Sequence, residues 1–109
     1  MKTIREILDD AIDDMDDDVL YSLSELNLLD HSDPNELDMT ADEIEKAMLK
    51  NKEIIDKIRN AQSRLYEWRK KIGESDGEQC KEEIFKELPY IKDRYERIKA
   101  REENSNNIE

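Results

Sequence analysis

The sequence is poor in the residues that make tight turns. Glycine and proline occur only twice each in 109 residues. Tight turns between β-strands depend heavily on glycine and asparagine, so a sheet-rich chain of this length would need more of them. A chain of 109 residues is also near the lower end of what buries a self-sufficient core. We therefore expect an all-α fold in no more than one globular domain.

Cysteine and histidine are scarcer still, with one of each, Cys80 and His31. A single cysteine cannot form an intramolecular disulfide, and a thiol nucleophile needs a base nearby. No paired carboxylates stand in a recognisable catalytic pattern. We expect no enzymatic activity, and hence no catalytic residues, no cofactor, no metal and no small-molecule substrate.

Long apolar runs are missing as well. No stretch is long and apolar enough to span a bilayer, and the first residues lack the hydrophobic core of a secretory signal. From this we expect a cytoplasmic location and no membrane contact.

Charge is distributed very unevenly along the chain. The net charge is −12, with 44% charged residues against 36% hydrophobic residues. Residues 1–45 contain sixteen acidic residues and only two basic ones, a balance of −14, whereas residues 46–109 carry a balance of +2. The acidity therefore belongs to the first part of the chain and indicates a basic partner rather than direct nucleic-acid binding.

The strongest helical pattern covers residues 40–72. Thr40 with Glu43 forms a capping box, and no glycine or proline follows until Gly73. The seam of this helix recurs at alternating spacings of four and three residues, which is typical of a helix packed along another helix. The seam residues are Ala47, Asn51, Ile54, Ile58, Ala61, Leu65, Trp68 and Ile72.

An acidic helix is expected near the N-terminus. Thr3 with Glu6 forms a capping box, and apolar residues such as Leu8 and Met15 fall on one arc of the helix while aspartates fall on the other. Asp18 would lie at the apolar edge, so we expect the helix to break there and a second helix to begin. A single bent helix is the alternative.

Three further signals divide the rest of the chain. Asp33 before Pro34 predicts an exposed connector over residues 31–39. Gly73 is suited to a left-handed C-cap, and Ser75 with Glu78 offers a third capping box. Pro89 lies in the middle of the last helical pattern, where it should kink or restart the helix.

These elements predict a long antiparallel helical hairpin with an acidic N-terminal helical arm packed on it. The short turn after Gly73 makes the helix of residues 40–72 and the last helix antiparallel neighbours, with Leu65 near Ile84 and Ile58 near Ile91. The expected divisions are an acidic arm (1–30), a connector (31–39), the hairpin (40–102) and a frayed polar tail (103–109).

The candidate binding surface is the acidic face of the arm. Seven aspartates lie between residues 9 and 18, about 15 Å of helix at ~1.5 Å per residue, a charge density close to the ~1.7 Å per charge of duplex DNA. This density would suit a decoy for a basic nucleic-acid groove, but runs of like charge are usually a solvated face, and the pattern favours that simpler interpretation. The face consists of Asp9, Asp10, Asp13, Asp14, Asp16 and Asp17.

A calcium-loop pattern also overlaps this face. Asp14, Asp16, Asp18 and Glu25 occupy positions 1, 3, 5 and 12 of the pattern, but Val19 stands where the loop needs glycine. We therefore expect no specific calcium binding.

Basic residues near the end of the chain offer a second surface, or partners for the aspartates. They are Lys92, Arg94, Arg97, Lys99 and Arg101. No glycine-rich loop or zinc pattern accompanies them.

The function expected from the sequence is a protein-binding module, an adaptor or inhibitor that presents its acidic face to a basic, nucleic-acid-handling protein. The alternative is a homo-oligomeric coiled-coil scaffold, with a homodimer as its simplest form.

Overall fold

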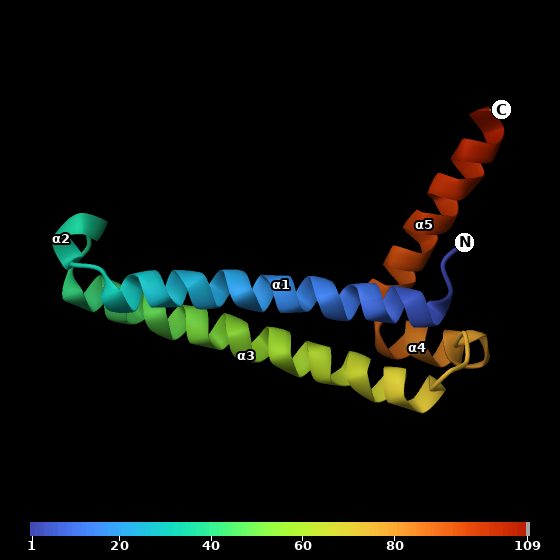
Figure 1. The fold of residues 1–109 in the computed structure, drawn as a ribbon, viewed down its shortest axis with the longest axis horizontal. Coiled ribbons are helices and arrows are strands. Elements are labelled where there is room, and N and C mark those ends of the chain that lie inside the picture. Colours follow the sequence, from blue (N-terminus) through green and yellow to red (C-terminus); the bar gives the residue numbers. More distant parts are fainter. Residues whose placement is uncertain (109) are drawn as a thin grey trace. The chain divides into compact units, whose positions relative to one another are not determined.

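The computed structural model describes residues 1–108 and is helical, without a strand in that range. The elements are α1 (Ile4–His31), α2 (Pro34–Leu37), α3 (Ala41–Ile72), the 3₁₀ turn η1 (Glu78–Cys80), α4 (Lys81–Glu87) and α5 (Pro89–Ile108). Helices α1 and α3 pack against each other, as Figure 1 shows. The prediction of an all-α fold with a helical hairpin is confirmed, but the helices packed together are α1 and α3, whereas the sequence pattern predicts the hairpin within residues 40–102.

The N-terminal cap of α1 is confirmed, but the break expected at Asp18 is wrong. The backbone N–H of Glu6 donates to the Thr3 hydroxyl at 3.1 Å, and the N–H of Thr3 donates to Glu6 Oε1 at 3.1 Å. From there α1 continues without interruption to His31. Asp18 is exposed, so its carboxylate stays in water inside a continuous helix and has no reason to end it. The single-helix alternative holds.

Helix α3 begins and ends where the sequence indicates. The Glu43 N–H donates to the Thr40 hydroxyl at 3.2 Å, and that hydroxyl donates to Glu43 Oε1 at 3.1 Å. At the other end Gly73 has a φ of 58°, the left-handed conformation that a helix C-cap favours.

The turn after α3 differs from the predicted third capping box. The Ser75 hydroxyl donates backward to the carbonyl of Ile72 at 2.7 Å, and the Glu78 N–H is accepted by Asp76 Oδ1 at 3.0 Å. Asp76 is closer to Glu78 in sequence than Ser75 is, so its carboxylate accepts the Glu78 N–H in a short local turn. Pro89 restarts the last helix as expected: α4 ends before Leu88, and α5 begins at Pro89.

The chain divides into two compact units, each of which combines separate stretches of sequence. Unit 1 consists of residues 1–13 and 64–109, and unit 2 consists of residues 14–63. Both long helices contribute to both units. The division into residues 1–30, 31–39, 40–102 and 103–109 stays a prediction about domains, and α5 extends through most of the segment expected to be a tail.

Unit 1 contains a well-filled apolar core. Its completely buried side chains come from α1, α3, α4 and α5, and Leu88 lies between the last two. Trp68 Nε1 donates to Glu87 at 2.8 Å, and the Arg5 N–H donates to the Asp76 carbonyl at 3.0 Å. The core residues below 2% exposure are Ile4, Ile7, Leu8, Ala11, Leu65, Ile84, Leu88 and Ile91.

Unit 2 has a much thinner interior. Only Val19 and Ile44 are buried apolar residues there, and Ser22, Asn51 and Gln62 are the buried polar ones. Large apolar side chains of the same unit remain exposed, namely Leu20, Tyr21, Leu23, Leu28, Leu49 and Ile54. Unit 2 therefore leaves at its surface large apolar side chains of the kind that unit 1 buries.

The cap at Thr3 should make the start of α1 sensitive to acid. The Thr3 N–H and then its hydroxyl hold the pKa of Glu6 below its ordinary value of 4.5. The stabilisation is therefore present above pH 4.5 and is lost as the pH falls through the lowered pKa. We expect Glu6→Gln to lower the melting temperature near neutral pH, with a difference from wild type that shrinks on acidification. Thermal melts over a pH series test this; a constant difference would contradict it.

Candidate protein-binding surface

Two aspartates of the predicted acidic face are engaged within unit 1. Asp9 Oδ1 accepts a hydrogen bond from Arg69 Nε at 2.8 Å, and the same guanidinium donates to the Gly73 carbonyl at 2.6 Å. Asp10 is paired with Lys2. These carboxylates help to fasten α1 to the end of α3 and to the N-terminus, so they are only partly available to another molecule.

Asp16 is engaged in the same way within unit 2. Its Oδ1 accepts from Gln62 Nε2 at 2.6 Å and lies 3.6 Å from Arg59 Nη1. Arg59 also donates to Gln62 Oε1 at 3.1 Å. Gln62 is only 2% exposed, so this small network is part of the α1–α3 packing. Apolar periodicity does not reveal Gln62, although its position one residue after the seam residue Ala61 places it near the same face.

The remaining three residues of the acidic face, Asp13, Asp14 and Asp17, are exposed. Asp13 and Asp17 are four residues apart, so they are neighbours on one face of α1. Within the described part of the chain, neither takes part in an ion pair. The structure thus separates Asp9, Asp10 and Asp16, which hold the fold, from Asp13 and Asp17, which face solvent.

Exposed apolar residues continue that solvent-facing side of α1 within unit 2. Asp17, Tyr21, Ser24 and Leu28 follow one another at spacings of four, three and four residues, which places them on one helix face. Tyr21 is 68% exposed and Leu28 is 58% exposed. A hydrogen bond with Glu25 raises the pKa of the Tyr21 hydroxyl, so the ring is held beside a carboxylate on the helix surface. We call these four residues the outer face of α1.

The basic residues of α5 do not form one surface. Lys92 and Lys99 are seven residues apart and share a face, whereas Arg94, Arg97 and Arg101 fall on the opposite side of the helix. Lys92 lies 4.0 Å from Glu96, and Arg97 donates to the carbonyl of Asp93. The arginines that pair with the aspartates of α1 come from α3 instead, which the sequence pattern did not indicate.

The calcium-loop pattern lies inside a helix. Residues 14–25 belong to α1, so their carboxylates are directed around the helix rather than inward from a loop. Within residues 1–108 no group of three or more histidine, cysteine or carboxylate side chains is arranged to hold a metal ion. In the same range, none of the helices has the length and apolar character that crossing a membrane requires.

Comparison with protein-family models, with curated proteins and with solved structures finds no match to this chain. Inference about its function therefore begins from the surfaces described above.

Proposed function

We propose that this chain is a non-enzymatic protein-binding module, and that it presents the outer face of α1 to a partner with a basic surface. The observation that carries the proposal is the exposure of Tyr21 and Leu28 on the same helix face as Asp17. A large apolar side chain that is more than half exposed gains free energy when a partner covers it, about 25 cal/mol per Å².

The spacing of these residues suits a known mode of recognition. A helix that docks in the groove of another protein uses anchors at successive turns of one face, and Tyr21, Ser24 and Leu28 provide that spacing. Asp17 extends the face with a carboxylate, and Asp13 is its neighbour one turn earlier. An apolar groove with lysine or arginine at its rim would match both the anchors and the charge.

The charge of the first part of the chain would act mainly on the rate of association. Complementary charge steers two proteins together and raises the association rate, and salt screens the effect. A protein that handles nucleic acid has the required basic surface, so this module would serve as its adaptor or as an inhibitor that occupies the nucleic-acid groove. The cytoplasmic location expected from the sequence belongs to this proposal.

Quantitative affinity capture with matched baits tests the proposal. We expect proteins retained by the wild-type chain to be basic, and to be lost from Tyr21→Ser with Leu28→Ser because the apolar anchors are gone. With Asp13→Asn and Asp17→Asn, the same proteins should associate more slowly, with a weaker dependence on salt.

The control variant removes two negative charges elsewhere in the hairpin. Glu53 and Asp56 are exposed on α3, so Glu53→Gln with Asp56→Asn lowers the negative charge equally without changing α1. Capture should survive in this control. If the Asp13→Asn, Asp17→Asn variant and the control variant weaken binding equally, net charge alone is responsible and the outer face of α1 is not the binding site.

A further inference from the structure

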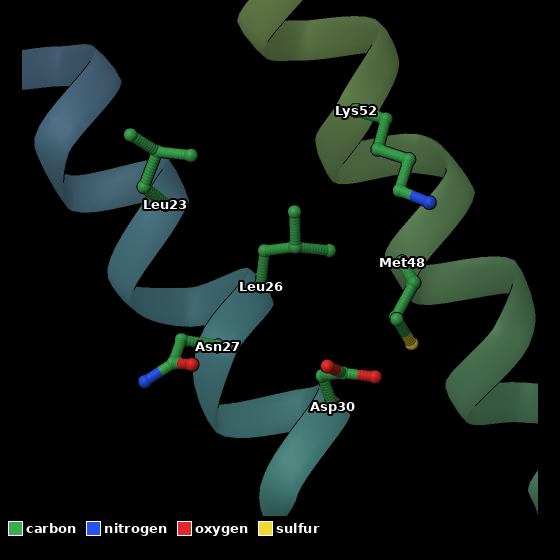
Figure 2. A pocket seen from close by; sticks show the side chains of 6 residues that line it. All are labelled: Leu23, Leu26, Asn27, Asp30, Met48 and Lys52. Carbon is green, nitrogen blue, oxygen red and sulfur yellow. The ribbon is translucent and has the colours of Figure 1, made fainter.

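A groove runs between α1 and α3 within unit 2, on a different side of α1 from the outer face. It has a volume of about 370 Å³. Leu23 and Leu26 line it from α1, and Met48 lines it from α3 (Figure 2). Leu23 is 42% exposed, so the apolar floor of the groove is open to solvent.

The walls of this groove carry opposite charges. Asp30 stands on the α1 wall and Lys52 on the α3 wall (Figure 2). Asp30 lies 3.8 Å from His31, and the described residues include no ion pair or hydrogen bond of Lys52. An exposed lysine beside leucine and methionine side chains offers a charge-assisted contact to whatever covers the groove.

We propose that the groove is covered by the same groove of a second copy of this chain. A two-fold interface is self-complementary: if residue i of one copy meets residue j of the other, then j also meets i. A surface with an acid on one wall and a base on the other satisfies this condition. Rotation about an axis along the hairpin brings Asp30 of each copy against Lys52 of the other.

The charges of α1 and α3 determine how the two copies pack against each other. The part of α1 in unit 2 carries six acidic residues and no lysine or arginine, whereas the part of α3 in this unit carries five of each sign. Packing α1 against α1 would oppose acid to acid, so α1 of one copy lies over α3 of the other. The product is a four-helix arrangement, which covers the two apolar floors with each other.

A charge exchange tests the proposal on the full chain. Sedimentation equilibrium should show the wild-type chain at twice the mass of one copy. Asp30→Lys and Lys52→Glu should each weaken this self-association roughly tenfold, because both contacts of the dimer then oppose like charges. Mixing the two variants should restore it, because each contact of the mixed dimer pairs a lysine with an acid; native mass spectrometry would show the mixed species in excess.

Lys57→Glu is the matched control, because Lys57 is exposed on α3 and does not line the groove. It makes the same charge change and should leave self-association near the wild-type value. Circular dichroism should show equal helicity in all variants. A monomeric wild-type chain would overturn the proposal, and so would a dimer that responds equally to Lys52→Glu and Lys57→Glu, or variants whose mixing restores nothing. None of these readouts involves a basic partner.

Discussion

Leu65→Ala is expected to lower the free energy of unfolding by about 2–5 kcal/mol, because it removes a completely buried side chain and leaves a cavity. Leu65 lies in unit 1, where α1, α3, α4 and α5 all contribute buried residues. A domain of this size has a total stability of about 5–15 kcal/mol, so the loss should be a large part of it. Urea denaturation followed by circular dichroism measures the change.

Leu49→Ala is the matched control on the same helix. Leu49 is 56% exposed, and substitutions at such positions usually change stability by no more than about 0.5 kcal/mol. Equal effects at the two leucines would contradict the assignment of the core to unit 1. The control should be measured at low protein concentration, so that self-association does not add to the stability.

Gly77→Ala is expected to cost about 2–4 kcal/mol, because it combines backbone strain with a steric clash. Gly77 has a φ of 87°, and a Cβ placed there would lie 2.9 Å from Ile4 Cβ and 3.2 Å from Ile72 Cδ1. The Ile4 Cβ is attached directly to the backbone of α1, so it cannot move aside cheaply. Thermal and urea unfolding would report the loss.

Gly73→Ala separates the two causes. Gly73 also has a positive φ, 58°, but a Cβ there would meet nothing within 4 Å. Only the strain remains, at about 1–2 kcal/mol. If the two alanine variants were equally stable, the close approach of α1 to the turn at Gly77 would be wrong.

Local features of this fold could be predicted from the sequence because the interacting residues are close together in the chain. The boxes at Thr3 and Thr40 satisfy backbone groups three residues away, and Pro89 lacks the N–H that would continue a helix. The capping box predicted at Ser75 is wrong because the Asp76 carboxylate, only two residues before Glu78, accepts the hydrogen bond of the Glu78 N–H instead. The helix break predicted at Asp18 is wrong because the periodicity of apolar residues does not show how wide the buried side of α1 is, and Asp18 lies outside that side.

The distribution of contacts between distant residues could not be predicted in the same way. The aspartates of α1 look alike in sequence, yet Asp9 pairs with a residue sixty positions away and Asp17 pairs with none among the described residues. Which acids are available for binding depends on how α3 presents Arg59 and Arg69. The exposed Tyr21 was likewise hidden in the sequence, because apolar residues on two sides of a helix blur its periodicity.

The composition of unit 1 has a consequence for the order in which the protein can fold during synthesis. Its first thirteen residues leave the ribosome before residues 64–109, which complete the unit. Ile4 and Leu8 must therefore wait for Ile84 and Ile91, while the intervening hairpin of residues 14–63 is already available for local pairing. A ribosome stalled before residue 84 would hold a nascent chain whose N-terminal apolar residues are still uncovered, and these are the residues that a chaperone would meet first.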